Sequence, residues 1–253
     1  MRENLQFYIN GKWVDPVEPR TLDVINPATE AIAGRISIGS AVDVDKAVEA
    51  AQAAFPDWSM TSKKERLLVL ERILAKFEDR VSELAGVITE EMGAPSWLAG
   101  EFHAPLGINH FKSAVAVLKD FSFKDDRGTT RVVMEPIGVC GFITPWNWPI
   151  HQVCAKTAPA LAVGCTIVLK PSEIAPFSAQ IFTEILDAAG VPPGVFNLVQ
   201  GEGPVVGAAM AAHPQIDMIS ITGSTRAGIE VARAAAKTVK RVHQELCGKS
   251  PNI

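Results

Sequence analysis

The sequence has little of what marks membrane, secreted or nucleic-acid-binding proteins. Its longest apolar run, residues 158–169, has 12 residues and includes a proline and a glycine, so it is too short to span a bilayer. The N-terminal Met-Arg-Glu-Asn-Leu-Gln contains no apolar stretch, and we expect no secretory signal. A net charge of -4 gives no sign of the basic face that nucleic-acid binding usually needs. We therefore expect a cytoplasmic protein with neither a membrane nor a nucleic acid as partner.

Cysteine is also scarce. The chain has four cysteines whose spacing fits no metal site, so we expect no metal ligands among them. Cys140, Cys154 and Cys165 lie in apolar or glycine-containing stretches, where we expect reduced thiols that pack as small core hydrophobes. With 253 residues, 47% hydrophobic and 21% charged, the chain is ordinary for a soluble globular protein of one large domain, with or without an appendage.

The first part of the chain, residues 1–119, predicts small strands followed by helices. Asn10-Gly11 is a two-residue turn signal between apolar residues, which predicts a hairpin of 7–9 with 13–14. Ser62 and Glu65 have the spacing of a capping box and precede an amphipathic stripe. The other expected elements are a strand at 22–25 and helices at 43–55, 81–92 and 97–118.

Residues 120–137 interrupt the helical pattern. Phe-Ser-Phe at 121–123 is followed by a turn-forming Asp-Asp-Arg-Gly and then by a β-branched run that ends at Met134, which predicts a hairpin. A polar-edged ribbon of this kind often pairs with another subunit. A surface hairpin of the same domain is an equal alternative.

From residue 138 to residue 248, strands and helices alternate. Apolar, β-branched segments separated by helical segments predict a mainly parallel sheet with helices on both faces. This is the doubly wound α/β class, in which ligands bind beyond the carboxyl ends of the strands. The expected strands are 137–143, 166–170, 195–199, 218–221 and 239–246, and the expected helices are 149–162, 178–189, 204–212 and 227–236.

Two glycine-containing motifs lie at strand-to-helix junctions. Gly201, Gly203 and Gly207 follow an expected strand, where glycines let backbone N–H groups approach a ligand. A tight turn without a ligand is the alternative. Thr222-Gly223-Ser224-Thr225 lies at a second junction, where a serine hydroxyl and a helix N-terminus suit a phosphate. An N-cap without a ligand is the alternative there.

The motif Lys170-Pro171-Ser172-Glu173 ends an expected strand. A lysine and a glutamate three residues apart on a turn can reach one ribose diol, the lysine as donor and the carboxylate as acceptor. The carboxylate repels a 2′-phosphate, which favours NAD over NADP. A solvated turn is the alternative.

Asn147 lies in a proline-rich turn. Pro145 and Pro149 fix the backbone around it, and a rigidly held side-chain amide can donate to a developing oxyanion. Taken alone, an asparagine in such a turn is more often only a turn former.

Glu245 ends the last expected strand, beside Leu246 and after Val242. A carboxylate in apolar company at the end of a strand can act as a general base. The alternative is an ion pair with Lys249 or Arg241.

Together these motifs resemble the cofactor half of the NAD(P)-dependent aldehyde dehydrogenase superfamily, over essentially the whole chain. The motifs occur in the order Thr144-Pro145-Trp146-Asn147, Lys170-Pro171-Ser172-Glu173, Gly201-Glu202-Gly203-Pro204-Val205-Val206-Gly207, Thr222-Gly223-Ser224-Thr225 and Glu245-Leu246-Cys247-Gly248-Lys249. The resemblance implies the NAD-binding domain of that family, with an oligomerisation hairpin at 120–137 and a homodimer or homotetramer in the full-length form. It implies NAD as cofactor, with NADP as the alternative because some relatives with this glutamate accept both. The cofactor-binding residues that it implies are Ile143, Thr144, Trp146, Lys170, Ser172, Glu173, Gly203, Gly207, Thr222, Gly223, Ser224, Ala227, Gly228 and Leu246.

The resemblance also implies an aldehyde substrate and two-step chemistry. A cysteine thiolate attacks the aldehyde while Asn147 stabilises the oxyanion; hydride transfer leaves a thioester, and Glu245 then activates water to release the acid. In the family, the nucleophilic cysteine lies on the C-terminal side of the Glu-Leu-Gly-Gly-Lys motif. Residues 249–253 resemble only the start of the catalytic domain, so we expect that domain to be missing and the 253-residue chain to be inactive alone.

One residue departs from the family pattern. Cys247 replaces a glycine, and its side chain adds bulk where the backbone bends close to the cofactor. We do not interpret Cys247 as the nucleophile, because it shares a backbone turn with Glu245. A truncated, non-catalytic nucleotide-binding or structural homologue is the alternative function. An acylating relative is a third, against which Glu245 counts.

Overall fold

The computed structural model describes residues 1–249, so the element that the sequence predicts to open at 250–253 lies outside the described residues. A seven-stranded sheet forms the centre of the molecule. Its strands, in spatial order, are β12 (Arg241–Leu246), β11 (Met218–Gly223), β8 (Val139–Ile143), β9 (Thr166–Lys170), β10 (Phe196–Leu198), β2 (Phe7–Ile9) and β3 (Lys12–Val14). The five strands from β12 to β10 are parallel, which confirms the predicted sheet.

The N-terminal hairpin extends this sheet. Asn10 and Gly11 have positive φ values of 53° and 74°, as a tight hairpin turn requires, and the predicted pairing of β2 with β3 is confirmed. β2 also pairs antiparallel with β10, where Tyr8 lies opposite Leu198. The sequence did not reveal this second pairing, because a turn fixes the register within a hairpin but not the hairpin's outer partner.

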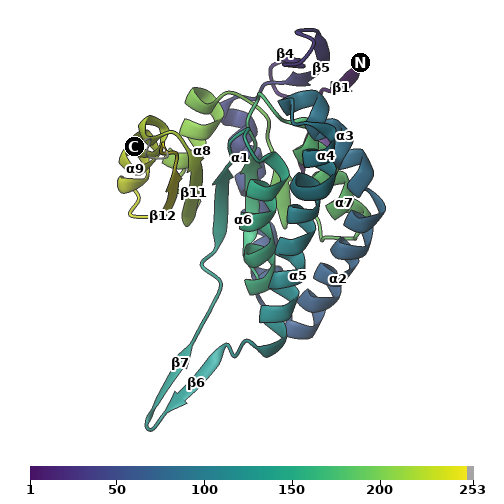
Figure 1. Ribbon diagram of the computed structural model, residues 1–253. Helices are drawn as coiled ribbons and strands as arrows, with labels where there is room; N and C mark the ends of the chain where they lie inside the picture. Colours follow the sequence, from purple (N-terminus) through teal and green to yellow (C-terminus); the bar gives the residue numbers. More distant parts are fainter. Residues whose placement is uncertain (250–253) are drawn as a thin grey trace.

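Helices cover both faces of the sheet, as the doubly wound class requires (Figure 1). Because successive strand residues point to opposite faces, Cys140 and Phe142 of β8 join one core cluster and Val139 and Ile143 join the other. The first face carries α2 (Lys63–Asp79), α3 (Val81–Met92), α5 (Ala104–Asp120), α6 (Pro149–Val163) and α7 (Phe177–Ala188). The second carries α1 (Ala41–Ser59), α8 (Ala208–Ala212) and α9 (Thr225–Ala236).

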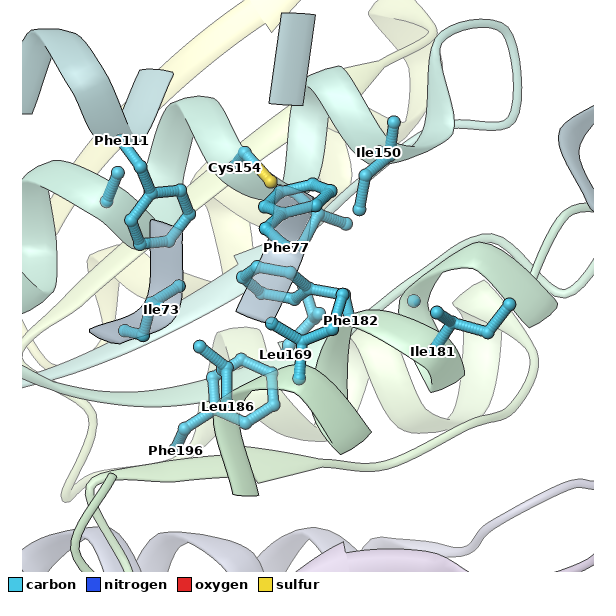
Figure 2. Packing of buried hydrophobic residues seen from close by; sticks show 14 of the residues in the cluster. Ile73, Phe77, Phe111, Ile150, Cys154, Leu169, Ile181, Phe182, Leu186 and Phe196 are labelled. Carbon is cyan, nitrogen blue, oxygen red and sulfur yellow. The ribbon is translucent and has the colours of Figure 1, made fainter. Parts of the chain in front are cut away.

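Aromatic rings bind the helices of the first face to the sheet (Figure 2). The Phe182 ring of α7 lies 5.9 Å from the rings of Phe77, Phe111 and Phe196, which belong to α2, α5 and β10. All four side chains are buried. Truncating one buried phenylalanine typically costs about 3–5 kcal/mol, so this cluster is a large part of what fixes the helices on the sheet.

The helix ends follow local signals in the sequence. The Ser62 hydroxyl accepts the Glu65 N–H at 3.2 Å, and the Glu65 carboxylate accepts the Ser62 N–H at 2.7 Å, which confirms the capping box. Gly93 ends α3 with a φ of 78°. The predicted helix at 97–118 is interrupted: α4 (Ser96–Leu98) passes into the π-helical turn η1 (Ala99–His103) before α5 begins.

A second, three-stranded sheet lies near the N-terminus. It consists of β1 (Arg2–Asn4), β5 (Ile32–Ser37) and β4 (Thr21–Ile25). Sequence patterns predicted β4 but not β1 or β5. In β5, Gly34 breaks the side-chain alternation, and a Cβ there would lie 2.5 Å from the Arg2 carbonyl oxygen, so the close approach of β1 requires glycine.

The predicted hairpin at 120–137 is present and projects from the body of the molecule (Figure 1). β6 (Lys124–Arg127) pairs with β7 (Thr130–Val133) in a two-stranded sheet, and Gly128 in the turn has a φ of 62°. The bidentate contact of Arg131 with Asp126, at 2.6 and 3.0 Å, links the two strands. Its pairing with another subunit stays a prediction. In the described part of the chain, no helix has the length and apolar character to cross a membrane.

Candidate cofactor site

The residues that the sequence singles out gather at the carboxyl ends of the parallel strands. Lys170 ends β9, Gly223 ends β11, Leu246 ends β12, and Thr144 follows β8. The register places Ile143 beside Lys170 and Gly223 beside Leu246. Motifs separated by up to a hundred residues in the sequence therefore share one edge of the sheet, which is the edge where doubly wound proteins bind ligands.

Lys170 and Glu173 form a close ion pair at this edge. The Lys170 Nζ lies 2.6 Å from a Glu173 carboxylate oxygen, and the Lys170 side chain is only 3% exposed. Burial lowers the pKa of Lys170, while the charges of Glu173 and Glu202 oppose that shift. Ser172 is buried, and its hydroxyl accepts the Ile174 N–H at 3.3 Å. The motif thus presents a cation and a carboxylate side by side, as the recognition of a sugar diol requires.

Three buried polar side chains near the same edge have no hydrogen-bond partner among the described residues. They are the hydroxyls of Thr144 and Thr222 and the whole side-chain amide of Gln200. A buried polar group without a partner costs about 1–3 kcal/mol, so such a cluster is consistent with a polar ligand. Gln200 is not among the residues that the sequence motifs predict for the site. The available signal was a polar residue between an apolar strand and the first glycine of the motif.

In the glycine motif, the turn requires glycine at Gly201, whereas the space around Gly203 is free of other atoms. A Cβ at Gly201 would lie 2.5 Å from a Val206 methyl group, and the φ of Gly201 is 151°, so the turn itself requires this glycine. At Gly203 a Cβ would meet no atom within 4 Å, which leaves that backbone accessible. The predicted helix here begins as a π-helical turn, η2 (Gly203–Gly207), before α8. The role of Gly203 and Gly207 in cofactor binding stays a prediction.

Ser224 caps α9. Its hydroxyl accepts the Ala227 N–H at 3.2 Å, and the side chain is exposed beyond the end of β11. A Cβ on Gly228 would lie 2.5 Å from Leu246, so the glycine lets α9 pack closely on β12. Helix capping is therefore one function of Ser224, and its predicted contact with a phosphate stays a prediction. The hydroxyl proton remains available to a phosphate oxygen.

Asn147 lies half-buried in the turn between β8 and α6. Its Oδ1 accepts the Trp148 N–H at 3.1 Å. Because a backbone N–H can only donate, this bond fixes which side of the amide is the carbonyl and leaves the NH2 group on the other side. Trp146 is 50% exposed, whereas Ile143 is buried, and their predicted contacts with a cofactor stay predictions.

The apolar setting predicted for Glu245 is wrong. Its side chain is 65% exposed, and its carboxylate lies 3.4 Å from the His243 ring rather than against Lys249 or Arg241. The physical reason is that β12 is the outermost strand of the sheet within residues 1–249, and only Val242 on it is even partly buried. Cys247 is also exposed, and its N–H donates to the Gly223 carbonyl at 2.8 Å.

A buried lysine that the sequence did not reveal, Lys156, lies close enough to Glu245 to sense its charge. The Lys156 ammonium donates to the Ser220 hydroxyl at 2.8 Å, and that hydroxyl lies 3.1 Å from Nδ1 of His243. Burial lowers the pKa of Lys156 to about 8, against the opposing effect of the Glu245 charge. These side chains border a cavity of about 500 Å³ on the α6 face, away from the carboxyl ends of the strands.

Cys140, Cys154 and Cys165 are buried and free, which confirms their prediction as core residues.

An aromatic stack that the sequence motifs do not predict lies next to Asn147. The ring of His103, from η1, lies parallel to the Trp148 indole, with centroids 3.8 Å apart and an interplanar angle of 8°. His151 meets the same indole edge-on, at 6.2 Å and 72°, and its Nδ1 lies 2.8 Å from Nε2 of His110. Burial is the main cause of a lowered pKa at all three histidines. No local sequence pattern predicts this stack, because His103 and Trp148 are far apart in the sequence.

Comparison with known proteins places these features in a family. A sequence profile described as "Aldehyde dehydrogenase family" matches residues 13–253. The 3-succinoylsemialdehyde-pyridine dehydrogenase of a Pseudomonas species is 59% identical over 254 residues, covering 100% of this chain and 53% of that protein. The chain therefore spans about half the length of the curated relatives it matches.

Solved structures give the same result. Aldehyde dehydrogenase C of Pseudomonas syringae, in a complex with NAD+ and octanal, is 55% identical with a TM-score of 0.96, over 98% of this chain and 51% of that one. The aldehyde dehydrogenase of Bartonella henselae is 49% identical with a TM-score of 0.97, over 100% of this chain and 54% of that one.

Proposed function

The chain belongs to the aldehyde dehydrogenase family, and on that premise we propose that it supplies the cofactor-binding half of an enzyme that oxidises an aldehyde to a carboxylic acid with NAD. The Lys170–Glu173 pair at the carboxyl end of β9 carries this proposal. The NAD+ and octanal bound by the Pseudomonas syringae relative support it.

The residues at the strand ends fit the chemistry of a dinucleotide. The Lys170 ammonium donates to ribose hydroxyls and the Glu173 carboxylate accepts from them. The negative charge of Glu173 disfavours the 2′-phosphate of NADP, so NAD is the proposed cofactor and NADP the alternative. The unpartnered hydroxyls of Thr144 and Thr222 offer further hydrogen bonds to a polar ligand.

The phosphates and the adenosine have separate sites in this proposal. Ser224 and the N-terminal N–H groups of α9 face a pyrophosphate, because a helix N-terminus attracts negative charge. The open backbone at Gly203 suits the adenosine side, with Gly207 beside it on η2. When bound, the cofactor would supply the acceptor for the hydride that leaves the substrate.

Two side chains of this chain act on the substrate in the proposed reaction. A cysteine thiolate, which we place in the half of the longer relatives that this chain does not span, adds to the aldehyde carbon, and the Asn147 NH2 group donates to the resulting oxyanion. After hydride transfer, the acyl group remains on the cysteine as a thioester. Glu245 then takes a proton from water, which displaces the thiolate and releases the acid. On this account the 253-residue chain alone binds NAD weakly or not at all and does not turn over aldehydes.

The proposed assembly is a homodimer or homotetramer joined through the β6–β7 hairpin. The hairpin projects from the domain, each of its strands pairs only with the other within the described residues, and Val133 is 48% exposed on it. Replacing 124–133 by a short glycine-serine linker should reduce the assembly size measured by light scattering, with the circular dichroism of the helices unchanged. An unchanged assembly size would contradict this interface.

We also propose a cytoplasmic location, in keeping with the four free cysteines.

The test of the function uses the whole gene product, titrated with NAD and NADP and then assayed for NADH formation with octanal and with 3-succinoylsemialdehyde-pyridine. The Glu173→Gln variant should reduce the preference for NAD over NADP by about tenfold, since the repulsion of the 2′-phosphate is lost. The exposed Glu71→Gln on α2 is the matched control and should leave the preference unchanged. Tight NAD binding without aldehyde-dependent NADH would instead support a non-catalytic homologue.

A further inference from the structure

We propose that His103 is a positioning residue for Asn147: its ring clamps the Trp148 indole, and the Trp148 backbone in turn holds the Asn147 amide with its NH2 group free to donate. The inference rests on the proposed function, because it deepens the role assigned there to Asn147. It assigns no contact between His103 and substrate.

The link between Trp148 and Asn147 is a single hydrogen bond. The Trp148 N–H donates to Asn147 Oδ1 at 3.1 Å. This bond selects one of the two orientations of the amide, because reversing the amide would bring two donors together. An oxyanion needs a donor that is already oriented when charge develops, so both the presence of this amide and its orientation affect the rate.

The link between His103 and Trp148 is a parallel stack. The ring centroids are 3.8 Å apart and the planes differ by 8°, while His151 closes on the indole edge-on at 6.2 Å. Trp148 is also the residue before Pro149 and α6, with a φ of -140° and a ψ of 67°. Because rings from two different helices contact the indole, we expect the backbone that carries its N–H to be restrained as well.

The local backbone of His103 shows how the stack is built. His103 is the last residue of the π-helical turn η1, which inserts one extra residue per turn and so shifts the direction of the following side chains. The ring is 1% exposed. Its Nδ1 has no hydrogen-bond partner within residues 1–249, so the face of the ring, rather than this nitrogen, makes the contact.

These contacts predict that a phenyl ring can replace the imidazole but a methyl group cannot. Phenylalanine keeps a flat ring over the indole and leaves no buried nitrogen without a partner. His103→Phe is therefore the conservative variant, and His103→Ala removes the stack. Burial, and then the nearby His151, lower the pKa of His103 and so favour its uncharged form, which phenylalanine and alanine both preserve.

The first measurement is residue-resolved hydrogen–deuterium exchange of the whole gene product. His103→Ala should accelerate exchange of the Trp148 N–H by about tenfold, and His103→Phe should keep it within about twofold of the wild type. The N–H of Leu161, buried on α6, the helix that follows Trp148, is the internal control for general loosening and should not change. Unchanged Trp148 exchange in His103→Ala, or equal acceleration in both variants, would overturn the proposal. This measurement does not depend on turnover.

The second measurement is the single-turnover rate of NADH formation as a function of aldehyde concentration, up to saturation. His103→Ala should slow it about tenfold with little change in KM, because the oriented donor acts mainly in the transition state, and His103→Phe should restore the rate. Asn147→Ala should slow it further, by about 100-fold or more. A normal rate in Asn147→Ala would refute the function proposed for Asn147. A slow Asn147→Ala with a normal His103→Ala would refute the positioning role alone.

Discussion

β9 and β12 belong to the same parallel sheet, and each ends in a motif with a predicted functional carboxylate, yet their surroundings differ completely. Every residue of β9 is buried, and Lys170 at its end is 3% exposed. On β12 only Val242 is even partly buried, and the Glu245 side chain is 65% exposed. The motif at the end of β9 therefore lies in a buried setting, whereas the motif at the end of β12 is exposed to solvent.

The position of each strand in the sheet explains the difference. β9 lies between β8 and β10, with α6 on one face and α1 on the other. β12 pairs with β11 alone among the described residues and receives α9 on one face. The composition agrees, since Thr-Ile-Val-Leu-Lys reads as a continuous apolar run and Arg-Val-His-Gln-Glu-Leu does not. A carboxylate at a strand end thus takes its environment from the neighbours of the strand, not from the motif.

The largest expected effect compares equal truncations on the two strands. Leu169→Ala on β9 should lower the free energy of unfolding by about 2–5 kcal/mol, because Leu169 is fully buried in the core of Figure 2 and its loss leaves a cavity. Leu246→Ala on β12 should cost less than about 1 kcal/mol, since that side chain is already 40% exposed. Urea denaturation of both variants measures the difference. Equal losses would show that β12 is as well covered as β9.

The second prediction concerns the lysine beneath the β12 edge. The pKa of Lys156 is lowered to about 8 from an ordinary 10.5, mainly by burial, so between these values the unfolded chain binds more protons than the folded chain. Stability should therefore rise with pH across that window, by about 3 kcal/mol at most.

Lys156→Met is the matched variant for this test. Lys240, whose pKa is also lowered to about 8 by burial, contributes a similar rise, and it remains in both proteins. The difference between the wild-type and Lys156→Met unfolding free energies, measured from pH 7 to pH 11, isolates Lys156. A difference that does not vary with pH would mean that Lys156 is hydrated. In that case the exposure of β12 to solvent would extend to the buried side chains next to it.

The contrast between β9 and β12 also shows where sequence patterns succeed. The turn at Asn10-Gly11, the capping box of Ser62 with Glu65 and the five parallel strands were predictable because each depends on residues close in sequence or on a strong apolar run. The proximity of Lys170 and Glu173 was predictable for the same reason, since the partners are three positions apart in the sequence.

The features that were missed depend on partners far apart in the chain. Lys156 and Ser220 are 64 residues apart, and the exposure of Glu245 follows from which strand lies at the edge. The π-helical turn at Ala99–His103 packs against α3, α5 and α6, but Gly100 within it and Pro105 just after it are local signals that the prediction of one continuous helix at 97–118 overlooked. Local propensity carries no record of such contacts, so only the folded arrangement reveals them.

The smallest expected effect separates capping from ligand binding at Ser224. Ser62 and Ser224 both cap a helix and both accept a backbone N–H at 3.2 Å, but only Ser224 lies at the strand ends, on the helix that covers β12. Replacing either by alanine should cost about 1 kcal/mol of unfolding free energy, because one backbone donor loses its acceptor. Only Ser224→Ala should also weaken NAD binding by the whole gene product, by about tenfold, since its hydroxyl proton alone is placed to reach a phosphate. Equal loss of stability with equal NAD affinity, measured by thermal denaturation and calorimetric titration, would reduce Ser224 to a helix cap and leave the Lys170–Glu173 pair as the better-supported contact with the cofactor.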